Sequence, residues 1–191
     1  HNGVSSAPGI RGQAAQFSRA QAQHLESPDT SDLSMGNHGF TFAGWVNLNS
    51  KQGEEIILSK GSSDPRQFEY LLRYEGGTTD RFSFILGDGR TGISRVDAHG
   101  LGSPSTHTWY FIVAWYDPDA QKTFLQVNDK PIDSNSWAFG SHDGPGTTRF
   151  GDYSNDPKSP GSRLDGLLDE WGVWKKVLTA RERSDLYNAG Q

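Results

Sequence analysis

Cysteine is absent from this sequence of 191 residues. The absence excludes disulfide bonds, zinc sites built from thiolates and catalysis by a cysteine nucleophile. Long apolar runs are also missing, since none approaches the roughly 20 residues that a membrane-spanning helix requires. The chain starts at His1 without a methionine and shows no signal peptide. We expect no membrane insertion, and we interpret the chain as an excised domain from which a secretion signal was removed.

Positive charge is scarce as well. The sequence has 18 lysine and arginine residues against 23 acidic residues, which gives a formal net charge of −5. No run of like charge creates a strong local field. Nucleic acids and anionic membranes bind proteins that present a basic surface. The charge balance therefore argues against both of them as the main partner.

Glycine and aromatic residues, by contrast, are abundant. There are 23 Gly, 9 Pro, 6 Trp, 6 Tyr and 10 Phe. Aromatic residues favour half-buried strands, and Gly and Pro supply the turns between them. The length suits one large all-β domain, and no linker or internal repeat divides the chain. We predict a single domain over residues 1–191, with loops at Ser27–Gly39, Gly87–His107 and Ser134–Thr147.

Alternation of apolar and polar residues marks the strands. The alternating segments are Phe40–Val46, Glu55–Ser59, Phe68–Tyr74, Phe82–Leu86, Trp109–Tyr116, Thr123–Asn128 and a last strand from about Leu164 to Trp174. Their regular spacing and turn-rich connections indicate two packed antiparallel sheets and not βαβ units.

One short helix is expected near the C-terminus. Thr179 and Glu182 have the spacing of a capping box, in which each side chain binds the other residue's backbone N–H. Gly190 permits the left-handed conformation that ends many helices. We expect this helix to lie against one end of the sandwich.

Four stretches resemble the bacterial laminin-G-like jelly-roll family, a branch of the concanavalin A-like superfamily that includes pentraxins. They are Gln16-Phe17 with His24-Leu25-Glu26 and Asp32-Leu33, then Phe40–Val46, then Trp109–Asp117 with Leu125–Asp129, and finally Leu164–Trp174 with Leu178-Thr179-Ala180. The resemblance covers nearly the whole chain. It implies an all-β, two-sheet antiparallel jelly-roll sandwich with one short C-terminal helix. It does not define a function, because the superfamily includes lectins, adhesion domains and glycosidases.

The acidic residues do not form the pair that a glycosidase needs. Retaining hydrolysis requires two carboxyl groups about 5 Å apart. Asp169 and Glu170 are adjacent, so a regular strand directs them to opposite faces. Asp165 and Asp169 share a face but lie roughly 13 Å apart. Glu54 and Glu55 fail for the same reason as the first pair, and we interpret them as a solvated turn.

Other catalytic motifs are missing from the sequence too. None of the six histidines forms an i, i+2 or i, i+4 pair, and no Gly-x-Ser-x-Gly elbow is present. Arg73 and Tyr74 do not make the cluster of Arg, His and Tyr that a polysaccharide lyase uses. We therefore expect a non-catalytic protein.

A first candidate ligand surface lies on the outer face of the strand pair at 109–128. If Ile112 faces the core, then Phe111, Trp115 and Phe124 gather outside, together with Trp45 from an earlier strand. An open aromatic platform of this kind would bind sugars by stacking. The alternative is that loops such as Gly87–His107 cover this face and bury it.

Two loops supply a second candidate. Trp137 and Tyr153 lie in polar, glycine-rich surroundings of the kind in which ligand contacts are common. Asn135, Asp152 and Asn155 would supply hydrogen bonds that orient a sugar. The alternative is that both rings are fixed over the edge of the core.

The resemblance also implies one structural calcium ion. Its ligands would be Asp169 of the closing strand and oxygen atoms of an early loop at Glu26-Ser27. Calcium takes six to eight oxygen ligands, and an oxygen-rich loop at Asp152–Asp156 is a second place to look. The alternative for Asp169 is a hydrogen bond to the backbone at the rim of the sandwich.

These observations favour a non-catalytic carbohydrate-binding accessory domain of a larger bacterial extracellular protein. The second hypothesis is a protein-interaction or adhesion domain, and a glycoside hydrolase or polysaccharide lyase on the same fold ranks last. We expect a monomer that is extracellular, periplasmic or on the cell surface. Its partner would be a carbohydrate or a protein, not a nucleic acid or a membrane.

Overall fold

The computed structural model describes residues 3–61, 68–90, 92–153 and 160–190. Its elements, in chain order, are β1 (Ser5–Pro8), β2 (Gln13–Phe17), the 3-10 helix η1 (Arg19–Gln21), β3 (Leu25–Ser27), β4 (Phe40–Leu48), β5 (Glu54–Gly61), β6 (Phe68–Glu75), β7 (Arg81–Gly87), β8 (Ile93–Asp97), β9 (Trp109–Asp117), β10 (Lys122–Val127), β11 (Asp133–Ser136), β12 (Thr148–Phe150), the 3-10 helix η3 (Pro160–Ser162), β13 (Gly166–Trp174) and α1 (Ala180–Ala189).

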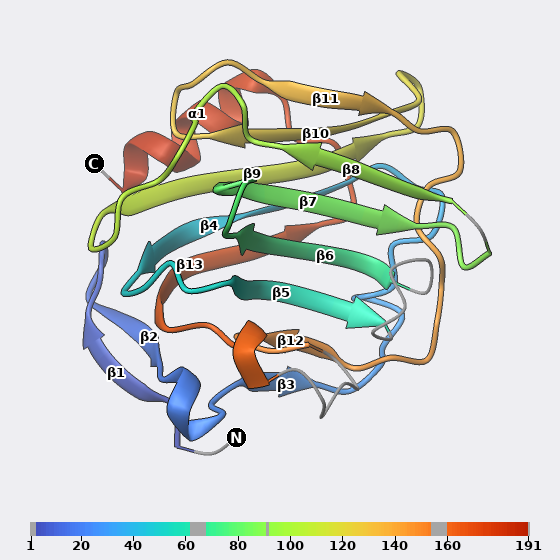
Figure 1. The fold of residues 1–191 in the computed structure, drawn as a ribbon. Helices are drawn as coiled ribbons and strands as arrows, with labels where there is room; N and C mark the ends of the chain where they lie inside the picture. Colours follow the sequence, from blue (N-terminus) through green and yellow to red (C-terminus); the bar gives the residue numbers. More distant parts are fainter. Residues whose placement is uncertain (1–2, 62–67, 91, 154–159, 191) are drawn as a thin grey trace.

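Two antiparallel sheets lie face to face (Figure 1). One has seven strands in the order β1-β2-β13-β4-β9-β10-β11, and the other has six in the order β3-β12-β5-β6-β7-β8. The last strand, β13, lies between β2 and β4 and pairs with both, so strands from the two ends of the chain are neighbours in one sheet. This crossing of distant segments is the jelly-roll arrangement, and it confirms the predicted fold.

The interior between the sheets is filled by the residues that alternation assigned to it. In β4 and β9 the buried core residues include Phe40, Phe42, Val46, Ile112 and Ala114. The register places Phe42 opposite Ala114, so a large ring fills the space that a small side chain leaves. The predicted inward faces of these two strands are therefore confirmed.

Three predicted segments differ in detail. β8 lies inside the predicted loop Gly87–His107, and β11 overlaps the start of the predicted loop Ser134–Thr147. Glu55 is not in a solvated turn: it lies in β5 with a fully buried side chain. The burial of Glu55 was not predictable, because a charged side chain is buried only when it has partners. The partners of Glu55 include Arg19 and Asp165, which are distant in the sequence.

The C-terminal helix has the predicted capping box. The Thr179 hydroxyl accepts from the Glu182 backbone N–H, and the Glu182 carboxylate accepts from the Thr179 N–H. The predicted position of this helix was wrong, because α1 lies across the outer face of the seven-stranded sheet and not against one end of the sandwich (Figure 1). Among the described residues, no helix is both long and apolar enough to cross a membrane.

A β-bulge interrupts the closing strand β13. The register with β4 shifts between Asp169 and Gly172, and Glu170 has a positive φ of 51°. Trp171 consequently lies over Gly44, where an added Cβ would stand 2.3 Å from the indole. Strict alternation therefore does not hold at Asp169 and Glu170, so it cannot assign their side chains to opposite faces.

Candidate functional site

The outer face of the seven-stranded sheet is covered. Trp45, Phe111 and Trp115 are only 4%, 3% and 4% exposed, because Leu186 and Tyr187 of α1 pack over them. The prediction of an open aromatic platform is therefore wrong. The cover is the C-terminal helix and not the predicted loop Gly87–His107, because the apolar side chains of α1 need a surface to pack on.

Phe124 also belongs to this covered layer. Its ring stacks on Trp115 at 4.8 Å between centroids and 9° between planes, and the Arg183 guanidinium lies 4.4 Å from the centre of the Trp115 ring. A groove of about 250 Å³ remains between α1 and the sheet, with Phe111 among its lining residues. The rings themselves are committed to packing against each other and against the helix.

Tyr153 and Asp152 form the loop after β12, and both are buried. The Tyr153 ring stacks on Phe68 at 5.7 Å, and its hydroxyl donates to Glu54 Oε2 (3.0 Å). Burial raises the pKa of the Tyr153 phenol. Asp152 accepts from Arg163 Nε (3.1 Å) and from the Tyr153 N–H.

Tyr153 and Asp152 are thus fixed over the outer face of the six-stranded sheet, which is the alternative that the sequence left open. The prediction that they are solvent-facing ligand contacts is not supported. Asn155 lies outside the described residues. Asn135 is exposed on the edge strand β11.

The two residues implied for calcium have other partners. Asp169 Oδ2 accepts from the Arg11 N–H (3.0 Å), and Oδ1 accepts from the Glu170 N–H (3.0 Å). Glu26 is paired with the Arg149 guanidinium, which lowers the pKa of Glu26. Among the described residues, no three His, Asp or Glu side chains converge as a metal site would require. This donor set does not fit the six to eight free oxygens that calcium takes.

Trp137 follows β11 and leads into a loop at one end of the sandwich. Its indole is 7% exposed, belongs to the main core and donates to the Gly140 carbonyl. Phe139 packs edge-on against it with centroids 5.2 Å apart and is itself 62% exposed. Trp137 therefore supports the loop from below, while Phe139 presents its ring to solvent.

A hollow of about 450 Å³ opens beside Phe139. Three connections line it: the β3–β4 loop, the β7–β8 turn and the β11–β12 loop. The side chains they contribute include Asn37, Asp88, Arg90, Phe139, His142 and Asp143. An aromatic ring next to amide, carboxylate, guanidinium and imidazole groups can combine stacking with oriented hydrogen bonds.

Backbone hydrogen bonds hold these three connections together. The Ser141 N–H donates to the Gly36 carbonyl (2.8 Å), and the His142 N–H donates to the Gly87 carbonyl (2.8 Å). Gly140 has φ +65°, and a Cβ there would stand 2.7 Å from the Asn37 Cα. Only glycine allows this close approach, so the shape of the hollow is fixed by the backbone.

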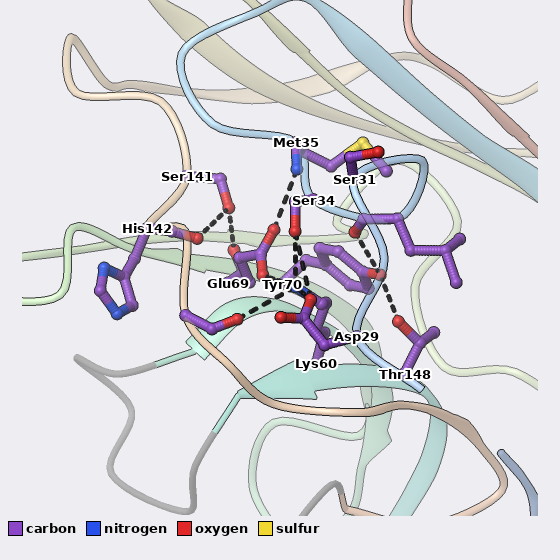
Figure 2. Close-up of polar contacts among 12 residues, drawn as sticks. Asp29, Ser31, Ser34, Met35, Lys60, Glu69, Tyr70, Ser141, His142 and Thr148 are labelled. Atoms are coloured by element: carbon purple, nitrogen blue, oxygen red, sulfur yellow. Dashed lines mark hydrogen bonds and ion pairs between the residues drawn. The ribbon is translucent and has the colours of Figure 1, made fainter. Parts of the chain in front are cut away.

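A buried polar cluster lies beneath the same loops (Figure 2). Lys60 of β5 is fully buried and pairs with Glu69 of β6 and with Asp29 Oδ1 (2.9 Å). Burial raises the pKa of Glu69, although the Lys60 ammonium acts against this rise. The same ammonium lowers the pKa of Asp29 through its hydrogen bond.

The sequence prediction named Trp137 of the β11–β12 loop, and the structure buries this ring and exposes Phe139 of the same loop. Trp137 and Phe139 are separated by one residue, and the larger Trp137 was selected as the contact. The sequence gives no signal for this difference, because the Trp137 N–H donates to the backbone carbonyl of Gly140 and every residue type carries such a carbonyl. Asn37, Asp88 and His142 carried no local signal, since only the fold brings their loops together.

Two packed antiparallel sheets with a loop-lined hollow at one end define this protein as a jelly-roll sandwich. Residues 19–182 match the Laminin_G_3 profile, described as the concanavalin A-like lectin/glucanases superfamily. The chain belongs to this superfamily, which confirms the expected resemblance. No curated protein has a sequence that matches it significantly.

Solved structures with the same fold include domain 4 of AbnA, a GH43 extracellular arabinanase from Geobacillus stearothermophilus, in complex with arabinotriose. It has TM-score 0.71 and 17% identity, over 98% of this chain and 82% of that one. The native heptameric SAP-like pentraxin from Limulus polyphemus has TM-score 0.59 and 13% identity, over 86% and 81%.

The binding domain of Botulinum neurotoxin DC in complex with rat synaptotagmin II has TM-score 0.71 and 13% identity, covering 100% of this chain but 46% of the toxin domain. This chain thus spans about half the length of that binding domain. At these identities the likeness establishes the fold alone. Two of these structures hold a partner, arabinotriose in AbnA domain 4 and synaptotagmin II on the toxin binding domain, so binding domains use this fold.

Proposed function

We propose that this chain is a non-catalytic carbohydrate-binding domain whose ligand is a neutral oligosaccharide bound in the hollow beside Phe139. One observation carries the proposal. Among the described residues, which include every aromatic residue of the sequence, Phe139 is the one aromatic side chain left exposed. It stands where polar side chains from three loops converge.

The chemistry of the hollow suits a neutral sugar chain. The C–H faces of sugar rings are apolar and stack on aromatic rings, while their hydroxyls both donate and accept hydrogen bonds. Asp88 and Asp143 offer acceptors, Arg90 offers donors, and Asn37 offers both. The two carboxylates disfavour an anionic sugar by like-charge repulsion.

The wider context of the domain is also part of this proposal. We infer an accessory role in a larger extracellular bacterial protein, acting as a monomer. Support comes from the fourth domain of the extracellular arabinanase AbnA, which has the same fold and is solved with a bound trisaccharide.

Calorimetric titration with arabinotriose, xylotriose, cellotriose and sialyllactose tests the proposal. We expect at least one neutral trisaccharide to bind and Phe139→Ala to weaken that binding tenfold or more, which is about 1.4 kcal/mol. Ile132→Ala is the matched control, because Ile132 is 46% exposed but precedes the opposite end of β11. Binding that is insensitive to Phe139→Ala, or no binding by any sugar, would refute the assignment.

A further inference from the structure

The Lys60–Glu69 pair is buried where β5 ends and β6 begins, beneath the β3–β4 loop and the β11–β12 loop. The register between these strands shifts at Lys60, which faces Tyr70 and leaves Glu69 as an extra, bulged residue. Both side chains turn toward the β3–β4 loop and the β11–β12 loop (Figure 2). Their exposed fractions are 0% and 1%.

The ammonium group of Lys60 bonds to both loops. In the β3–β4 loop it reaches Asp29 Oδ1 (2.9 Å) and Ser34 Oγ (2.9 Å). In the β11–β12 loop it donates to the Gly144 carbonyl (3.2 Å). The amine therefore spans two segments that are more than a hundred residues apart in the chain.

Glu69 makes a second set of bonds to the same two loops. Its Oε1 accepts from the Met35 N–H (2.9 Å), next to the Gly36 and Asn37 wall of the hollow. Its backbone carbonyl accepts from Ser141 Oγ (2.7 Å), on the opposite wall. Each member of the ion pair thus bonds to both loops, at Ser141 of the hollow's lining and at Met35 and Gly144, which are next to lining residues.

A buried ion pair is a poor source of stability, because apolar side chains of similar volume commonly stabilise a core as well or better. Apolar side chains cannot, however, form directed bonds to polar loop atoms. We propose that Lys60 and Glu69 are positioning residues that hold the Asn37 wall and the Phe139 wall in their ligand-ready arrangement. The inference rests on the proposed function of that hollow.

A preformed hollow binds more tightly than one whose loops must be ordered by the ligand, since ordering costs conformational entropy. Replacing the pair with Lys60→Met and Glu69→Leu together removes the side-chain bonds to both loops without leaving an unpaired buried charge, and the Glu69 carbonyl still accepts from Ser141 Oγ. We expect the double variant to fold with nearly wild-type sheet content and to bind the best neutral trisaccharide of the panel at least tenfold more weakly.

The matched control is Arg19→Met with Glu55→Leu, a second ion pair in which Arg19 of η1 and the buried Glu55 contact the β4–β5 loop instead. It lacks contacts with the hollow, so we expect unchanged trisaccharide affinity at a temperature where it remains folded. Equal loss of affinity in both double variants would indicate a general stability effect and would overturn the inference.

Hydrogen exchange separates this inference from the proposed function. In the Lys60–Glu69 double variant we expect the amides of Met35 and Ser141 to lose protection, while the central strands β4 and β9 keep theirs. If no sugar binds the wild type, the carbohydrate assignment fails, but this exchange pattern still supports the positioning role. Unchanged protection at Met35 and Ser141 would overturn it.

Discussion

Glu55 links the stability of this domain to pH. Its carboxylate is fully buried in β5, accepts hydrogen bonds from Ser50 Oγ (2.7 Å) and the Asp165 N–H (2.7 Å), and pairs with Arg19. Removal from water outweighs these contacts and raises the pKa of Glu55 from 4.5 to about 7. The folded state therefore favours the protonated carboxyl.

The direction of the effect follows from proton linkage. Between pH 4.5 and about 7 the folded state binds more protons at Glu55 than the unfolded state. The free energy of unfolding therefore falls as the pH rises through this window, and the contribution of the raised pKa is fully present below it. Because each pKa unit corresponds to about 1.36 kcal/mol, the full effect is about 3 kcal/mol.

Urea denaturation of the wild type and of Glu55→Gln, at about pH 5 and about pH 8, measures this effect. Glutamine keeps an acceptor oxygen but does not titrate, so the difference between the two proteins cancels the contribution of the six histidines. We expect the stability of the wild type relative to Glu55→Gln to fall by about 2–3 kcal/mol between these pH values. A constant difference would show that Arg19 keeps Glu55 ionised and would refute the reasoning.

Four further outcomes are expected. Thr179→Ala removes the helix cap and lowers the free energy of unfolding by about 1 kcal/mol in urea denaturation. Truncation after Leu178 removes α1, exposes the rings beneath it and lowers stability by at least about 3 kcal/mol, with increased binding of an apolar dye. Gly44→Ala forces a Cβ into the Trp171 ring and costs about 1–3 kcal/mol, seen as a lower Tm. EDTA leaves the Tm unchanged, because Asp169 already accepts two backbone N–H bonds; a clear fall in Tm would instead indicate a bound cation.

The inner faces of the strands were predictable because burial in a sandwich imposes a period of two residues. Phe42 and Ile112 follow it, and both lie in the main core as expected. The same period correctly separated Phe111 and Trp115 from that core. It could not show what covers them, since α1 reaches this face only through the tertiary path of the last residues of the chain.

The bulge in β13 was not predictable for a different reason. A positive φ at Glu170 is unusual for a residue with a Cβ, and no local sequence signal requires it. The bulge fits Trp171 over Gly44, so its cause lies in the neighbouring strand β4. Glu55 and Lys60 escaped prediction in the same way, because their partners come from loops that are distant in sequence.

The proposed location of the binding site follows from how the two outer faces are closed. On the seven-stranded sheet α1 seals the aromatic layer. On the six-stranded sheet Arg73 pairs with Glu54 and Glu75, and Tyr153 packs beside them on Phe68. Among the described residues, neither outer face therefore presents a fully exposed aromatic ring. The loops at the Phe139 end are the place where an exposed ring lies beside polar side chains, and the proposed role of the Lys60–Glu69 pair is to hold these loops in a defined shape.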